Sequence, residues 1–167
     1  MTPECLLRHP AVVYLCLVRP NPVDEFPTPT YLQNHEAVLA AFGYWPDFHD
    51  SPLRWMEIWS PPDGIVEMVI HTGEMTPKPD QRGYYSWVKN HLVAFRFSDV
   101  RDLEFHQFTI PNTLIEMTFS PPSEVQGSRR FTVHPISVMG GDCFAKFSAG
   151  AGEVTSVKPC DKEGNRV

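Results

Sequence analysis

The chain has 167 residues and a mass of 19.0 kDa, the size of one domain, which argues against a multi-domain enzyme. Hydrophobic residues make up 42% of it, enough to bury a core without a metal or disulfide staple, whereas its 17 prolines argue against long uninterrupted helices. The net charge of −6 argues against a surface that neutralises nucleic-acid phosphates and favours a basic partner over an acidic one.

The acidic excess lies entirely in the first half of the chain. Through Tyr84 there are 5 basic and 11 acidic residues, and the remainder holds 9 of each. Two interpretations stay open: a solvated acidic face that keeps the domain soluble, or a surface that steers a basic partner.

The N-terminal section and the cysteines indicate in which cellular compartment the protein is expected. Residues 11–18 are apolar but too short to span a bilayer, which takes about 20 residues, and they predict a buried strand. No small-residue cleavage site follows them, so a signal peptide is not indicated. The cysteines lack the spacing of a zinc ribbon or redox pair and are typical of reduced cytosolic thiols, which predicts a cytoplasmic protein without a membrane segment. These cysteines are Cys5, Cys16, Cys143 and Cys160.

Residues 19–29 contain four prolines, which fix φ and remove backbone donors, so they predict an extended linker. We therefore divide the chain into an N-terminal strand and linker, residues 1–29, and a single domain, residues 30–167. The domain opens with a predicted amphipathic helix over residues 31–42. Thr30 and Gln33 have capping-box spacing, and Gly43 is a good residue to end the helix.

After the helix the apolar period changes to two, with turns rich in Pro, Gly, Asn and Asp. This pattern predicts an α+β fold, mostly β: an antiparallel meander that closes as a sandwich or half-barrel, with the helix packed on it. If Val66, Met68 and Ile70 face the core, Glu67 and His71 face the other side. The expected strands cover residues 53–59, 65–71, 84–88, 92–97, 103–110, 113–119, 129–133, 143–147 and 154–157.

The densest local motif spans residues 44–51, where the helix gives way to the first strand of the domain. It contains Trp45, Pro46 and Phe48, followed by His49 and Asp50. An adjacent His-Asp pair can act as acid and base or supply metal ligands. The favoured interpretation is structural, since Asp in a corner commonly bonds backbone N–H groups. No nucleophile motif or metal-ligand spacing accompanies the pair, so we assign no catalytic residue, metal or cofactor.

The same motif resembles the W-P-x-F-H-D-[AS] signature of the immunity protein 50 family, small proteins encoded beside bacterial polymorphic toxins. Residues 83–85, 91–97 and 99–104 are similar to later strands of that family, and the resemblance covers roughly residues 36–150. It implies a binding protein that neutralises a cognate toxin by forming a stoichiometric complex, without catalysis.

The expected partner is therefore a toxin domain, a basic nuclease being the usual case, and neither nucleic acid nor a membrane. Acidic steering and aromatic anchors would supply recognition. Two alternatives remain: a small metal-binding or hydrolytic enzyme centred on His49 and Asp50, or an interaction domain outside any toxin system. The oligomeric state stays open. The candidate contacts are Glu57, Glu67, Glu74, Asp80, Tyr84, Trp87 and Glu104.

Overall fold

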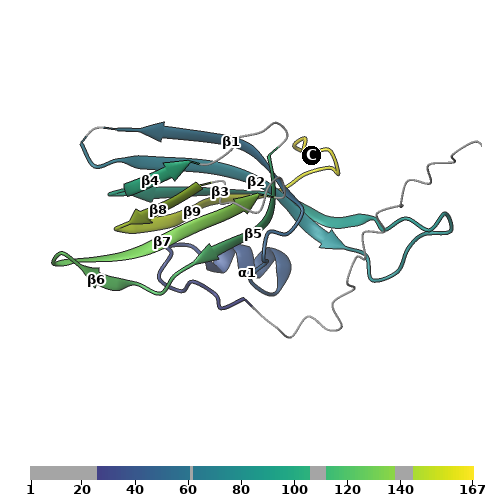
Figure 1. Ribbon diagram of the computed structural model, residues 1–167. Helices are drawn as coiled ribbons and strands as arrows, with labels where there is room; N and C mark the ends of the chain where they lie inside the picture. Colours follow the sequence, from purple (N-terminus) through teal and green to yellow (C-terminus); the bar gives the residue numbers. More distant parts are fainter. Residues whose placement is uncertain (1–25, 61, 106–111, 138–144) are drawn as a thin grey trace, which may run out of the picture.

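The computed structural model describes residues 26–60, 62–105, 112–137 and 145–167. Within these ranges it contains nine strands and one helix, and all pairings between the strands are antiparallel (Figure 1). The prediction of a mostly β protein is confirmed. The elements are α1 (Glu36–Phe42), β1 (Ser51–Trp59), β2 (Ile65–Met75), β3 (Trp87–Ser98), β4 (Arg101–Phe105), β5 (Thr113–Phe119), β6 (Ser123–Val125), β7 (Ser128–Ser137), β8 (Ala145–Ala149) and β9 (Ala151–Pro159).

The strands form one path in the order β4-β8-β7-β5-β1-β2-β3-β9, with β6 paired to β7. A meander describes only β1, β2 and β3, because the chain then passes to the other end of the path. We call β1-β2-β3-β9 the first half and β4-β8-β7-β5 the second half. They join where Ser51 pairs with Leu114 and Pro52 with Thr113.

The core lies between the two halves and is built largely from phenylalanines. The ring of Phe97 on β3 lies 5.3 Å from that of Phe147 on β8 and 6.3 Å from that of Phe131 on β7. Phe95 reaches Phe119 on β5 at 6.1 Å. These contacts across the interior mean that the halves pack face to face, and the aromatic rings contribute more than their buried area alone.

Alternation along β2 is confirmed: Val66, Met68 and Ile70 are all buried on the inner side. His71 points away from them but is also buried, at 8% exposure. The C-terminal turn covers it, since a side-chain atom added at Gly164 would lie 3.1 Å from the His71 ring. A contact between residues so distant in sequence could not be predicted from the period of two.

The helix is shorter than predicted, because the segment before it pairs with the edge of β9. The N–H of Gln33 donates to the carbonyl of Gly152, and the N–H of Val154 donates to the carbonyl of Gln33, both at 2.9 Å. The capping box is therefore wrong, and the N-cap residue is His35, without a side-chain cap. The predicted end is correct: Gly43 adopts a left-handed conformation, with φ of 87°.

Other predicted element boundaries also differ from those in the structure. The strand predicted over residues 84–88 is largely wrong, because residues 84–86 lie in the loop of the long β2–β3 hairpin, which projects beyond the other strands in Figure 1. The short strand β6 was not predicted. Of the expected strands, residues 106–110 and 143–144 lie outside the described ranges, as does the N-terminal strand. Phe26, assigned to the linker, packs against the core.

The two crossings between the halves meet at one corner. Residues 99–100 connect β3 to β4, and Gly150 alone connects β8 to β9. The N–H of Gly150 bonds the carbonyls of Ser98 and Asp99. Arg130, only 3% exposed, donates to the carboxylate and carbonyl of Asp99 and to the carbonyl of Ser148. A buried guanidinium held by this many acceptors ties both crossings to β7.

Candidate functional site

The predicted motif forms a tight corner between α1 and β1. The carboxylate of Asp47 accepts from the N–H of His49 at 2.9 Å, and its carbonyl accepts from the N–H of Met117 at 3.0 Å. Phe48 and Asp50 both have positive φ, 60° and 55°. Such conformations are strained for residues other than glycine and persist where surrounding contacts fix them. Here the burial of Phe48, together with the bonds of Asp47, fixes the turn.

The aromatic residues of the motif belong to the core. Trp45 is 3% exposed and lies 6.0 Å from the ring of Phe48 and 5.8 Å from that of Phe119. Pro46 is also buried. These side chains anchor the corner on the aromatic cluster between the halves, so the recognisable part of the motif is explained by packing.

His49 and Asp50 lie at the outside of the corner. The Nδ1 of His49 is 3.0 Å from a carboxylate oxygen of Asp50, and both side chains are about half exposed. In the described ranges no group of three or more His, Cys, Asp or Glu side chains could hold a metal ion. The paired histidine and carboxylate are open to solvent, and nothing among the described residues encloses them so as to exclude water from a reaction.

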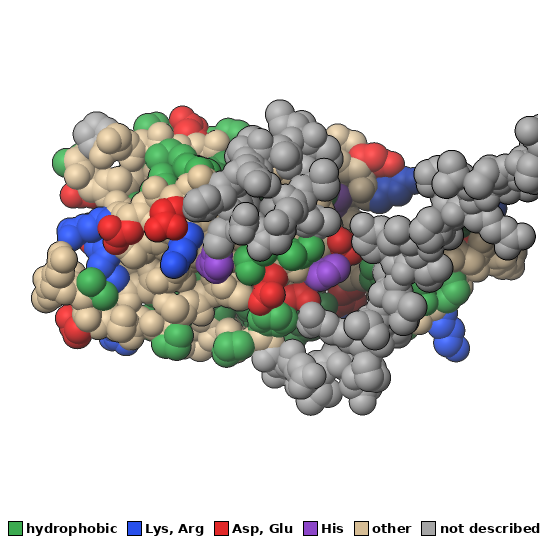
Figure 2. Space-filling view, in the orientation of Figure 1, with side chains coloured by type: hydrophobic (Ala, Val, Ile, Leu, Met, Phe, Trp, Pro, Cys, Tyr) green, Lys and Arg blue, Asp and Glu red, His purple; other side chains and the backbone are tan. Residues whose placement is uncertain are grey.

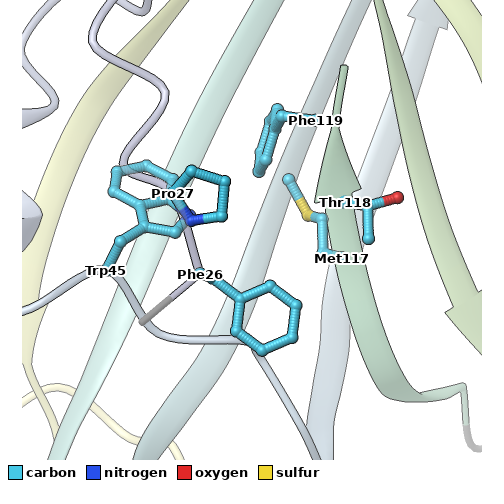
Figure 3. A pocket seen from close by; sticks show the side chains of 6 residues that line it. All are labelled: Phe26, Pro27, Trp45, Met117, Thr118 and Phe119. Atoms are coloured by element: carbon cyan, nitrogen blue, oxygen red, sulfur yellow. The ribbon is translucent and has the colours of Figure 1, made fainter. Parts of the chain in front are cut away.

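A small hollow lies beside the same corner (Figure 3). Its volume is about 90 Å³, whereas pockets for small molecules usually measure roughly 300–1,000 Å³. The lining is apolar apart from Thr118, whose hydroxyl points away from the ring of Phe119 in Figure 3. The hollow has neither the size nor the polar groups of a metabolite site. It is lined by Phe26, Pro27, Trp45, Met117, Thr118 and Phe119.

A row of charged residues crosses the outer face of the first half. Glu57 on β1 lies directly opposite Glu67 on β2, Glu67 opposite Arg96 on β3, and Arg96 opposite Glu153 on β9. Arg96 reaches the carboxylate of Glu67 at 3.0 Å. The row therefore holds three carboxylates and one guanidinium, with two carboxylates adjacent. Like charges in directly opposite positions of two strands are destabilising.

Two tryptophans flank the β1 end of this row. Trp55 and Trp59 stand two residues to either side of Glu57, so all three share one face of the strand, and the rings are 42% and 38% exposed. Ile58, on the opposite face of β1, is 43% exposed. Sequence reasoning missed both tryptophans as surface residues, although the W-x-E-x-W spacing was the available signal.

The remaining predicted contacts lie elsewhere. Glu74 pairs with Lys89 at 2.7 Å on the β2–β3 hairpin. In its loop the Asp80 carboxylate accepts from the N–H groups of Arg82 and Tyr84. Tyr84 is 70% exposed, and the neighbouring Trp87 is half-buried. Glu104 lies on β4, at the other end of the strand order. The structure thus brings together Glu57 and Glu67, and separately the hairpin residues, but not all seven.

Titration at the base of the hairpin is shifted by burial. The pKa of Tyr44 is raised to about 12, first by desolvation and then by the negative charge of Glu74 and a hydrogen bond between the two side chains. On the other half, burial and the positive charge of Lys146 lower the pKa of His134. Neither residue adjoins the charged row, so these shifts describe packing of the fold and not chemistry of that row.

The charge distribution also bears on recognition. On the face shown in Figure 2, acidic and basic side chains of the described residues are interspersed and do not gather by sign. A broad acidic field is therefore not visible on that face, and the local row through Glu57 is the better-defined acidic feature.

Comparison with protein-family models, with curated proteins and with solved structures finds no match. In the part of the chain that the structure describes, no helix is long and apolar enough to cross a membrane.

Proposed function

We propose that this protein is an immunity protein, which neutralises a cognate bacterial toxin by binding it and carries out no catalysis. The observation that carries the proposal is the outer face of β1 and β2, where Trp55 and Trp59 flank the opposed carboxylates of Glu57 and Glu67. Exposed aromatic rings beside an unbalanced charge provide the two components of a protein-binding hot spot, buried area and electrostatic complementarity.

The proposal also draws on the similarity of residues 44–51 to the immunity family signature. In this chain that segment is a core-anchored corner, so its part in the function is to position β1, which begins at Ser51. The Ser51 hydroxyl is buried and bonds Thr72 on β2 at 2.9 Å. The corner therefore sets where the tryptophan-bearing face of β1 and β2 begins.

The class of partner follows from charge. A basic toxin surface, such as that of a nuclease, would pair with the carboxylates of the row and would be attracted by the net charge of −6. We expect the association rate to fall steeply between low and physiological salt, because the Debye length shortens from about 30 Å at 0.01 M to about 8 Å at 0.15 M. A rate that is flat across this range contradicts electrostatic steering.

The decisive experiment is co-expression with the toxin domain encoded beside this gene. We expect growth to be rescued and the two proteins to co-purify at a fixed stoichiometry. A Trp55→Ala, Trp59→Ala double variant should lose both effects while its thermal unfolding midpoint stays close to that of the parent. A Val125→Ala variant is the control, since this exposed apolar residue lies on β6, away from β1 and β2. Failure of both rescue and co-purification contradicts the proposal.

The enzyme alternative has its own test at His49 and Asp50. In an enzyme, His49→Ala removes turnover and leaves the fold intact. In the binding protein proposed here, the same change removes a half-exposed contact with Asp50, leaves toxin binding intact and lowers the unfolding midpoint slightly.

A further inference from the structure

The long β2–β3 hairpin ends in a projecting arm that the proposed function does not use. β1 pairs with β2 as far as Ile70, and β9 pairs with β3 as far as His91. Beyond these residues β2 and β3 continue together, and in Figure 1 they project past the other strands. We call residues 72–90 the arm. Its tip is exposed throughout residues 77–86.

Large apolar side chains are exposed on both faces of the arm. Met75 lies opposite Trp87, so these two share one face, whereas Glu74 lies opposite Val88 on the other face. Met75 is 43% exposed and Val88 is 42% exposed, and Tyr84 at the tip is 70% exposed. A flat surface placed against the arm would cover one face and leave the other in water. A cleft would bury both faces, and burial of apolar area drives association.

The tip carries an excess of positive charge in a chain that is acidic as a whole. Lys78 and Arg82 are exposed and form no ion pair in the described part of the chain. The carboxylate of Asp80 accepts from the N–H groups of Arg82 and Tyr84, so it serves to shape the loop. With two cations and one carboxylate, residues 76–86 have a net charge of +1, against −6 for the chain. An acidic surface is therefore the complement of the tip.

Hydrogen bonds within the chain hold the arm in one shape. The N–H of Thr76 bonds the carbonyl of Ser86, and the N–H of Ser86 bonds the hydroxyl of Thr76. At the base of the arm, the Lys89 ammonium donates to the carboxylate of Glu74 and to the carbonyl of Phe42 at the end of α1. A segment that is already ordered loses less conformational entropy on binding, so more of the contact energy appears as affinity.

We propose that the arm inserts its tip into an acidic cleft of the partner protein, with Lys78 and Arg82 against carboxylates and the apolar side chains of both faces against the walls. The inference deepens the proposed function and rests on it for the identity of the partner, the toxin domain. Met75 stands eight residues beyond Glu67 on β2, about 25 Å at the usual rise of a strand. The partner should therefore present a basic surface to the charged row and an acidic cleft to the arm, and this order of charges fixes its orientation.

A second copy of this chain fits the arm less well, although its charged row is acidic. The row lies across the face of a sheet, so it would cover one face of the arm and leave either Met75 or Val88 exposed. Exposed apolar groups on both faces thus favour a cleft in another protein over self-association.

The test measures the affinity of the full chain for the toxin domain encoded beside its gene, by titration calorimetry. A Lys78→Gln, Arg82→Gln double variant removes the cations of the tip. The matched control is an Arg129→Gln, Lys146→Gln double variant, which makes the same change in net charge at exposed positions of β7 and β8. The thermal unfolding midpoint of each variant shows that it remains folded.

We expect the Lys78→Gln, Arg82→Gln variant to bind about tenfold more weakly, and the control to bind within about twofold of the parent. Tyr84→Ala should also weaken binding about tenfold, because the cleft would bury this tyrosine. In the complex the methyl signals of both Met75 and Val88 should shift, because these residues lie on opposite faces of the arm.

Several results overturn the inference. Tighter binding by the Lys78→Gln, Arg82→Gln variant would show that a basic surface faces the arm. A methyl shift at only one of Met75 and Val88 contradicts insertion into a cleft. A parent that is a dimer by light scattering, and that becomes a monomer on Tyr84→Ala, would identify a second copy as the occupant. Absence of a complex refutes the proposed function and this inference together, whereas a complex that the arm variants do not weaken refutes this inference alone.

Discussion

The two faces of the first half place the same kind of residue in opposite roles. On the inner face, Phe95 and Phe97 are at most 1% exposed and contact rings from the second half. On the outer face, Trp55 and Trp59 expose about two-fifths of their surface beside carboxylates. Inner rings are surrounded by partners within the chain, whereas the outer rings lie on the same face of β1 as Glu57 and are partly open to solvent. Stability should therefore depend on the inner face, and partner recognition on the outer one.

Loss of an inner ring should have the largest effect. Phe97→Ala removes a ring that contacts Phe95, Phe119, Phe131 and Phe147. We expect it to lower the free energy of unfolding by about 3–5 kcal/mol, measured by urea denaturation. Trp59→Ala, the same kind of truncation on the outer face, should cost about 1 kcal/mol or less. Equal losses for the two variants would remove the distinction between the faces.

The buried guanidinium at the corner should come next. Arg130→Met removes the guanidinium that donates to the carboxylate of Asp99 and to the carbonyls of Asp99 and Ser148, so that Asp99 keeps only the Arg101 side chain and the Gly150 N–H as donors among the described residues. Because Asp99 is partly exposed and can be rehydrated, we expect a loss of about 2–3 kcal/mol in the free energy of unfolding. Its exposed neighbour supplies the control: Arg129→Met should change the same quantity by less than about 0.5 kcal/mol.

Alkaline pH should weaken the region behind the hairpin. The pKa of Tyr44 is raised to about 12 from 10.0, mainly by desolvation and then by Glu74. The unfolded chain therefore loses this proton first, and the stabilisation, complete below pH 10, declines as pH rises toward 12. Difference absorbance at 295 nm follows the ionisation, and unfolding curves from pH 9 to 12 follow the stability. A Tyr44→Phe variant should show a shallower decline, and an unchanged decline contradicts the assignment.

The smallest expected change in the free energy of unfolding has the opposite sign to the others, because it is a gain in stability. Glu57→Gln removes the like-charge contact with Glu67 and should raise the free energy of unfolding by about 0.2–1 kcal/mol. Glu67→Gln also removes the ion pair with Arg96, so it should give little or no gain. Toxin affinity should fall in the Glu57→Gln variant even as stability rises. A stability loss in that variant would indicate that Glu57 has a structural role.

Sequence reasoning succeeded where local alternation decides the outcome. It placed Val66, Met68 and Ile70 inside and predicted the end of the helix at Gly43, because both depend on neighbours a few residues away. It failed at the start of the helix, where Gln33 bonds β9 residues about 120 positions later. Strand order and the burial of His71 depend on equally remote contacts.

The candidate site was predicted only in part. Glu57 and Glu67 were chosen for charge, and their direct pairing across β1 and β2 depends on a register that spacing alone does not fix. Trp55 and Trp59 were missed because tryptophan is usually buried, and which face of the first half is covered depends on where the second half packs against it. The aromatic motif was conspicuous in the sequence for packing reasons, since Trp45 and Phe48 belong to the core.

The corner at Gly150 has a consequence for how the molecule can deform. Both covalent crossings between the halves lie there, bonded to each other through the Gly150 N–H and to Arg130. At the opposite margin, the described residues form a seam in which Ser51 and Pro52 pair with β5 and the N–H of Leu53 bonds the carbonyl of Asn112. The corner joins the layers by covalent chain as well as by hydrogen bonds, so movement of one layer against the other would turn about it.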